Sequence, residues 1–214
     1  MVKVGWLLKR IVVKYEPGAS KVALMEDDLL TEFYMEKPDE RERAGNIYKG
    51  KVVNVLPGMQ AAFVDIGLQR NAFLYIDDLL PVHLEKKPAA KPSISDLVKV
   101  GQELLVQVKK EPVGNKGARI TTHFTIPGRY VVLLPHADYV AVSRKIEGEA
   151  ERQRLTEIGE RIRRPGDGVI IRTIAEGEGD ESLASDMAML NDIWDGIVKR
   201  YAECKAPSLL YRDL

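Results

Sequence analysis

The sequence predicts an α+β protein, rich in strands, whose centre is a five-stranded barrel from about Asn46 to Thr125. Three observations predict this class. Short strand-like runs separated by Gly, Pro or Asn follow one another through that region: KGKVVNVLPGMQAAFVDIG, RNAFLYIDDLL, GQELLVQVKKE and ARITTHFTI. The charged segment 36–44 separates them from earlier strand-like runs. Helical periodicity is found only after Thr125.

Composition excludes several classes of protein. The 32 basic and 32 acidic residues cancel, so any anion-binding site is a local patch rather than a property of the whole chain. Basic residues gather at 86–91, 109–119 and 161–164. The single cysteine, Cys204, excludes an internal disulfide and a CxxC metal site. Neither a membrane-length apolar run nor a signal peptide is present, so we expect no membrane partner and a cytoplasmic location.

The first 35 residues or so contain the β-rich runs VGWLL, RIVVKY and KVALM, and the turn signal EPGAS follows the second of them. We expect strands joined by hairpins. Three strands with apolar side chains that need cover are marginal alone, so they are expected to belong to a larger sheet.

A basic segment interrupts the barrel between Leu80 and Ile94. Its three prolines and three lysines cannot continue a strand ladder, which predicts a loop. Two readings remain open for this loop: a solvated insertion without a role, or a phosphate-contacting element.

After Thr125 the pattern becomes mixed α/β. Strands are predicted at Arg129–Pro135, Tyr139–Ser143 and Val169–Ile174, with a helix over Glu149–Ile162. A second helix follows Gly179. Its apolar residues recur every three or four positions and form one stripe that is expected to pack in the core: Leu183, Met187, Leu190, Trp194, Ile197 and Tyr201.

The predicted barrel carries residues suited to single-stranded nucleic acid. Barrels of the OB type stack bases on aromatic side chains and follow the phosphates with lysines. Phe63 and Phe73 lie in neighbouring strands, where alternation with period two allows both rings to share one face. The alternative for both rings is core filling. The basic side chains expected nearby are Lys49, Lys51, Lys110, Lys116 and Arg119.

Five motifs in order resemble the amino-terminal half of the ribonuclease E/G endonucleases: NIYKGKV, AAFVDIG, GNKGARITT, RKIEG and VIIRT. The barrel segment by itself resembles the S1-like RNA-binding motif through its Gly50-Lys51-Val52, Pro57-Gly58-Met59 and Val100-Gly101-Gln102 elements. The likeness extends from about Asn46 to Tyr211.

This resemblance implies a domain order. Residues 1–42 would be strands of a partial RNase H-like domain, 43–125 an S1-like OB-fold domain, 126–208 an α/β 5′-sensor domain, and 209–214 the start of the remainder. It also implies that Phe63, Phe73, Lys110 and Lys116 contact single-stranded RNA. Lys49 and Arg119 complete the RNA-binding set that we predict.

A phosphate pocket is implied at Arg172 and Thr173, with help from Val132. Arginine offers paired donors to a phosphomonoester, and threonine adds a hydroxyl and an amide. An Arg-Thr pair at the end of a strand is by itself more often structural. The resemblance implies that these three residues bind the 5′-monophosphate of RNA.

No catalytic or metal site is predicted in this chain. In the resembled family, Mg²⁺ bound by paired aspartates of a DNase I-like domain performs the hydrolysis, and Zn²⁺ links subunits through cysteines; both sites are expected beyond Leu214. Of the present residues, the Asp27-Asp28 and Asp77-Asp78 pairs diverge on a strand or decorate turns. The three histidines, His83, His123 and His136, lack the spacing of a nucleophile or metal site.

The leading hypothesis is therefore the RNA-binding, 5′-monophosphate-sensing portion of a ribonuclease E/G-type endoribonuclease of RNA processing and decay. It is expected to bind single-stranded RNA, preferably 5′-monophosphorylated, without cleaving it. The alternatives are a free-standing, non-catalytic S1-like adaptor and, last, an enzyme with an unrecognised active site. Because the family's oligomerisation elements are expected outside these residues, we expect a monomer or weak dimer.

Overall fold

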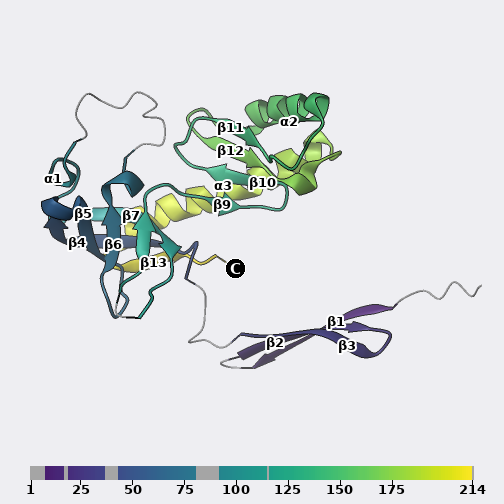
Figure 1. Ribbon diagram of the computed structural model, residues 1–214, viewed down its shortest axis with the longest axis horizontal. Coiled ribbons are helices and arrows are strands. Elements are labelled where there is room, and N and C mark those ends of the chain that lie inside the picture. The colour runs from purple at the N-terminus through teal and green to yellow at the C-terminus, as the bar shows by residue number, and fades with distance from the viewer. Residues whose placement is uncertain (1–7, 17–18, 37–42, 81–91, 115, 214) are drawn as a thin grey trace, which may run out of the picture. The chain divides into compact units, whose positions relative to one another are not determined.

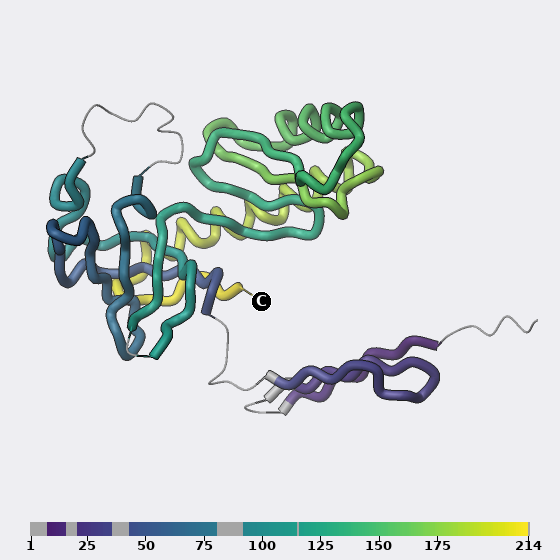
Figure 2. Tube along the Cα trace, in the orientation of Figure 1, coloured from purple at the N-terminus to yellow at the C-terminus, as the bar shows by residue number. Residues whose placement is uncertain are grey.

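The computed structural model describes residues 8–16, 19–36, 43–80, 92–114 and 116–213. The chain forms two compact units, residues 1–42 and 43–214. The ribbon and the Cα trace show the course of each unit (Figures 1 and 2).

The first unit is an antiparallel sheet in the order β1-β2-β3, made of β1 (Lys9–Glu16), β2 (Ala19–Glu26) and β3 (Leu29–Glu36). Asp27 and Asp28 join β2 to β3 with positive φ, as a tight hairpin turn requires. Two of the predicted runs lie in β1 and β2, but the third strand is LLTEFYME; of VGWLL only Leu8 is described. The neighbours Val12 and Val13 are both exposed, so both faces of the sheet present apolar side chains.

The second unit begins with a closed barrel, which confirms the predicted fold class (Figure 1). The strands lie in the order β4-β5-β6-β8-β7, and β4 pairs with β7 to close it. Only β6 and β8 run parallel; the other pairs are antiparallel. The strand bounds are β4 (Ile47–Leu56), β5 (Ala61–Asp65), β6 (Ala72–Tyr75), β7 (Glu103–Lys110) and β8 (Arg119–Thr121).

Short turns and one added strand complete the barrel. The 3₁₀ turns η2 (Pro57–Met59) and η3 (Ile76–Asp78) follow β4 and β6. Helix α1 (Ile94–Leu97) begins with a capping box from Ser93. The basic loop predicted between Leu80 and Ile94 lies largely outside the described residues, which omit 81–91. Strand β13 (Ser208–Tyr211) returns from the end of the chain to pair with β4.

A second sheet, in the order β11-β12-β10-β9, packs one face against two helices. Its buried face carries Val131, Leu133, Val169 and Ile171, which pack with the apolar sides of both helices. The predicted helical stripe is confirmed as core. The bounds are β9 (Ile126–Pro127), β10 (Val131–Leu134), β11 (Val140–Val142), β12 (Gly168–Ile171), η4 (Thr173–Ala175), α2 (Glu149–Ile162) and α3 (Asp180–Glu203).

Helix α3 connects the second sheet to the barrel (Figure 2). Trp194 and Ile197 near its carboxyl end share one hydrophobic cluster with Ile47 of β4 and Leu210 of β13. The barrel interior is a separate cluster around Val64, Leu74, Val106 and Ile120. The barrel and the second sheet are therefore joined through packed apolar side chains.

Candidate nucleic-acid interface

Three aromatic rings form a continuous row on the outside of the barrel. Phe63 of β5 and Phe73 of β6 are direct cross-strand partners, with ring centroids 5.5 Å apart at 74°. The centroids of Phe73 and Tyr75 lie 4.4 Å apart. We call Phe63, Phe73 and Tyr75 the aromatic strip.

Strand alternation produces this row. Ala62, Val64 and Leu74, the neighbours of the two phenylalanines, are buried in the barrel, so the phenylalanines point to its outer face. The prediction that Phe63 and Phe73 share one face is thus confirmed. Both rings are half-buried rather than enclosed, while Tyr75 is exposed, which argues against simple core filling.

Arg119 contacts the strip, and two exposed lysines lie on the neighbouring strand and turn. The guanidinium carbon of Arg119 lies 4.9 Å from the centroid of the Tyr75 ring, a cation–π geometry. Lys110 is exposed on β7 directly opposite Arg119 in the β7–β8 ladder. Lys116 is exposed in the turn before β8, where it forms an isolated bridge with Val113.

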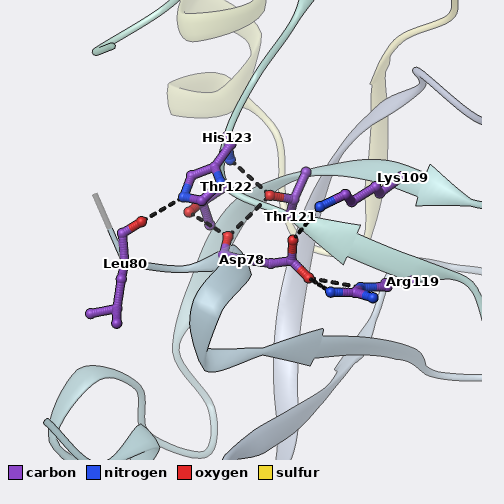
Figure 3. A network of polar contacts seen from close by, with 7 residues as sticks. All are labelled: Asp78, Leu80, Lys109, Arg119, Thr121, Thr122 and His123. Carbon is purple, nitrogen blue, oxygen red and sulfur yellow. Dashed lines mark hydrogen bonds and ion pairs between the residues drawn. The ribbon is translucent and has the colours of Figure 1, made fainter. Parts of the chain in front are cut away.

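The buried carboxylate of Asp78 binds two cations, Lys109 and Arg119 (Figure 3). The side chain of Asp78 is 3% exposed; its Oδ1 accepts a hydrogen bond from Lys109 Nζ at 2.8 Å. Its Oδ2 accepts a hydrogen bond from Arg119 Nε at 2.8 Å and forms an ion pair with Arg119 Nη2 at 2.7 Å. Burial alone would raise the pKa of Asp78, but the bonds from Lys109 and Arg119 outweigh it and hold that pKa below its ordinary value.

The backbone around Asp78 is fastened as well. Its carbonyl oxygen accepts from the amide of Thr122 at 2.8 Å and from the hydroxyls of Thr121 and Thr122 at 3.1 Å each. His123 Nε2 lies 2.5 Å from the carbonyl oxygen of Leu80 (Figure 3). These bonds connect turn η3, which follows β6, to the segment after β8. They lie at the end of the short parallel pairing of β6 with β8.

Lys49 requires a correction. It was predicted among the RNA-contacting cations, but the residue is 7% exposed. Its ammonium donates to the carbonyl oxygens of Tyr201 and Cys204 at 3.0 and 2.8 Å and pairs with Glu103 at 2.9 Å. These carbonyls belong to the carboxyl end of α3, where a cation is favoured by the unpaired C=O groups. Lys49 fastens α3 to the barrel instead of facing solvent.

A second polar cluster lies at the end of β12. The predicted residues Arg172 and Thr173 are exposed there. The Arg172 guanidinium donates through Nη1 to the carbonyl oxygen of Gly128 at 2.5 Å. The hydroxyls of Thr173 and Ser143 are 2.8 Å apart. We call Gly128, Val132, Ser143, Arg172 and Thr173 the Arg172 cluster.

Val132 joins this cluster through the sheet register. It is the cross-strand partner of Ile170, two residues before Arg172, whose backbone is still extended. Alternation therefore places Val132 and Arg172 on the sheet face opposite the one that packs on the helices. Val132 is half-buried.

The turn before β10 is held by another buried carboxylate, Asp186 of α3. Its oxygens accept from the backbone amides of Arg129, Tyr130 and Val131 at 3.2, 2.7 and 3.0 Å. A Cβ added to Gly128 would lie 2.6 Å from Asp186 Oδ2, so the approach needs glycine. Asp186 thereby places the Gly128 carbonyl that receives Arg172.

Comparison with known proteins matches both halves of the second unit. Residues 41–122 match the S1 RNA binding domain, and residues 125–214 match the ribonuclease E/G family. The chain carries an S1 domain followed by a ribonuclease E/G family domain.

The relatives are considerably longer. Ribonuclease G of Escherichia coli (strain K12) is 44% identical over 209 residues, covering 95% of this chain and 43% of the relative. Ribonuclease G of Haemophilus influenzae is 42% identical over 209 residues, covering 95% and 42%. Ribonuclease E of Nostoc sp. is 45% identical over 170 residues, covering 79% and 24%. The chain thus spans less than half the length of these relatives.

A cleft of about 300 Å³ lies between the S1 domain and the family domain. Leu79, Thr122 and His123 line one side, and residues 134–137 and Tyr139 line the other. The Thr122 hydroxyl and His123 Nε2 already bond to carbonyl oxygens. The cleft is therefore assigned no ligand.

The residues that the structure describes contain neither a metal-binding cluster nor a membrane-spanning helix. Within those residues, no group of three or more His, Cys, Asp or Glu side chains is placed to hold a metal ion. None of the described helices is both long enough and apolar enough to span a bilayer.

Sequence reasoning missed Tyr75 and Asp78. Tyr75 carries a usable signal, because it stands two residues after Phe73 in the same strand and so shares its face. Asp78 carries none, since an Asp-Asp pair before a loop resembles an ordinary turn. Only the closure of the barrel shows that Asp78 is buried beside two cations.

Proposed function

We propose that this chain binds single-stranded RNA through the aromatic strip and recognises a 5′-monophosphate through the Arg172 cluster. It would serve as the RNA-binding and 5′-sensing portion of a ribonuclease E/G-type endoribonuclease of RNA processing and decay. The observation that carries the proposal is the half-exposed Phe63–Phe73 pair, continued by Tyr75 and Arg119, on the outside of an S1 domain.

The strip suits unpaired bases. Every base has a π-face that stacks on an aromatic ring, whereas the bases of a duplex are already stacked on one another. Lys110, Lys116 and Arg119 supply positive charge for the phosphates beside the rings. Such a surface favours single strands with little sequence preference.

Removal of one ring tests this part. Phe63→Ala is expected to weaken binding of a fluorescein-labelled single-stranded RNA by about 5- to 150-fold, the effect of losing one stacked base. Anisotropy at fixed salt measures it, with a melting curve to verify folding. Met59→Ala, which truncates an exposed apolar side chain in the adjacent η2 turn, is the control. Equal affinities for wild type and Phe63→Ala would contradict the proposal.

The Arg172 cluster suits a terminal phosphate. A phosphomonoester carries nearly two negative charges and three acceptor oxygens. The guanidinium of Arg172 and the paired hydroxyls of Ser143 and Thr173 supply donors of the required kinds in one small region. Val132 provides an apolar neighbour on the same face.

Preference for the 5′ end is the appropriate measurement. Arg172→Ala is expected to lower the ratio of affinities for 5′-monophosphorylated and 5′-hydroxyl RNA by about 10- to 150-fold, the effect of one lost charge-assisted hydrogen-bond pair. Arg161→Ala on α2 removes the same charge from an exposed residue and is the control. An unchanged ratio in Arg172→Ala would refute the 5′-sensing assignment.

We further propose that these residues bind RNA without cleaving it. The family's Mg²⁺-binding aspartates and zinc-linking cysteines belong to parts to which none of the present motifs corresponds. Incubation with Mg²⁺ and a 5′-monophosphorylated, AU-rich single strand is the test. Specific cleavage by the purified chain would overturn this part of the proposal.

A further inference from the structure

We propose that Asp78 is a positioning residue for RNA binding: its buried carboxylate holds the guanidinium of Arg119 on Tyr75 and so fixes the cationic end of the aromatic strip. The inference rests on the proposed function of the strip. Asp78 itself is enclosed and is not expected to touch RNA.

The geometry of Arg119 supports this role. Its Nε–H donates to Oδ2 of Asp78, and its Nη2 forms an ion pair with the same oxygen. The hydrogen bond and the ion pair together restrain the guanidinium, whose carbon lies 4.9 Å from the Tyr75 ring centroid. An arginine side chain otherwise samples many rotamers, and ordering it during binding would cost free energy. A preset guanidinium avoids that cost.

The β7–β8 ladder contributes the second cation. The ladder shifts register between Val108 and Lys110, so that Lys109 is the extra residue of a bulge. Lys110 stays opposite Arg119, while Lys109 bonds to the other oxygen of Asp78. The bulge thus separates two neighbouring exposed lysines. Lys109 donates to the Asp78 carboxylate, whereas Lys110 lies opposite Arg119 on the strip side of the ladder.

Electrostatics alone predicts the opposite effect for Asp78. A carboxylate near an RNA-binding surface repels phosphate and reduces the local positive charge. Its removal should then tighten RNA binding. If the carboxylate positions Arg119, its removal should weaken RNA binding although the protein becomes more positive. The sign of the change separates the two roles.

The decisive variant is Asp78→Asn, which keeps the size of the side chain and removes its charge. We expect its affinity for a 5′-hydroxyl single-stranded RNA to fall by roughly 5- to 30-fold, as for loss of one ordered cation–π contact. Asp77→Asn changes the charge equally at the next residue, which is exposed, and is expected to bind as tightly as wild type or more tightly. Asp78→Asn binding as well as Asp77→Asn would overturn the inference.

A double-mutant cycle tests whether Asp78 acts through Arg119. In an Arg119→Ala background, Asp78→Asn should cause less than a twofold further loss of affinity, because the group that it positions is gone. Independent, multiplying losses would assign Asp78 a general structural role. The 5′-monophosphate preference depends on the Arg172 cluster in the other sheet, and its retention reports that the variants are folded.

Wild-type protein provides a test if Asp78→Asn does not fold. The Nε–H proton of Arg119, bonded to Asp78, should give a protected NMR signal that shifts on addition of RNA without broadening into exchange with water. A signal that never shifts, or that vanishes on binding, would contradict positioning. Failure of the proposed function is distinguishable, because Phe63→Ala would then leave RNA affinity unchanged as well.

Discussion

The two candidate RNA contacts of this protein are each backed by a buried aspartate, but the two carboxylates are satisfied in different ways. Asp78, behind the aromatic strip, accepts from the side-chain cations Lys109 and Arg119. Asp186, behind the Arg172 cluster, accepts from three successive backbone amides. Side-chain cations can turn to water when their anion is removed, whereas amides of a packed turn cannot. Asp78 therefore fixes the position of side chains, and Asp186 fixes the conformation of the main chain.

The largest expected effect is at Gly128. Gly128→Ala would place a methyl group 2.6 Å from Asp186 Oδ2 and break the amide contacts of the turn. We expect a loss of about 2–4 kcal/mol in the free energy of unfolding and of the 5′-monophosphate preference. Denaturant melts and paired binding measurements check both. Gly196→Ala on α3, where an added Cβ meets nothing within 4 Å, should be neutral or stabilising.

We expect the Asp186 variant to lose more stability and the Asp78 variant to lose more RNA affinity. Asp186→Asn leaves buried amides without full acceptors and is expected to cost about 2–3 kcal/mol of unfolding free energy, against about 1 kcal/mol for Asp78→Asn. For RNA with a 5′-hydroxyl, Asp78→Asn should show the larger loss of affinity. The comparison fails if one variant is worse in both urea unfolding and RNA titration.

Lowering the pH should affect the two contacts in different windows. The second pKa of a phosphomonoester is about 6, so the preference for 5′-monophosphate should fall by several-fold between pH 7 and pH 5. Although burial acts in the opposite direction, hydrogen bonds from Lys109 and Arg119 hold the pKa of Asp78 below the ordinary value of an aspartate. Its contribution to stability is therefore present above that value and is lost only as the pH falls below it. The ratio of affinities for 5′-monophosphorylated and 5′-hydroxyl RNA is measured from pH 5 to 7, and thermal melts are continued to pH 3. A loss of stability already between pH 7 and pH 5 would contradict the separation of the two windows.

The smallest expected effect concerns the lysine that the structure reassigns. Lys49→Met should lower stability, because its ammonium bonds two carbonyl oxygens and Glu103, yet change RNA affinity by less than about twofold. Lys110→Met should weaken RNA binding by a few-fold. It should also reduce the slope of log affinity against log salt concentration by the amount expected for about one phosphate contact. Titrations at several salt concentrations compare the pair. Equal salt slopes for both variants would contradict the distinction.

The sequence predicted the strands and helices that carry the candidate sites, but it did not predict where every charged side chain points. Alternation predicted that Phe63 and Phe73 share a face, and helical periodicity predicted the buried stripe of α3. It failed for Lys49, because nothing local distinguishes a lysine facing solvent from one facing the end of a helix 152 residues later. Asp78 and Asp186 were missed for the same reason: a carboxylate's partners are set by long-range packing.

Helix α3 also fixes the distance between its contact with the second sheet and its contact with the barrel. Asp186 in its first half holds the turn beside Arg172, and Tyr201, fifteen residues on, receives Lys49 of the barrel. At 1.5 Å per residue these attachment points are roughly 22 Å apart along the axis. A helix, and not a loop, therefore spans the distance between the second sheet and the barrel. If both proposed sites bind one RNA, this helix limits how many nucleotides can lie between its 5′-phosphate and the bases on the barrel.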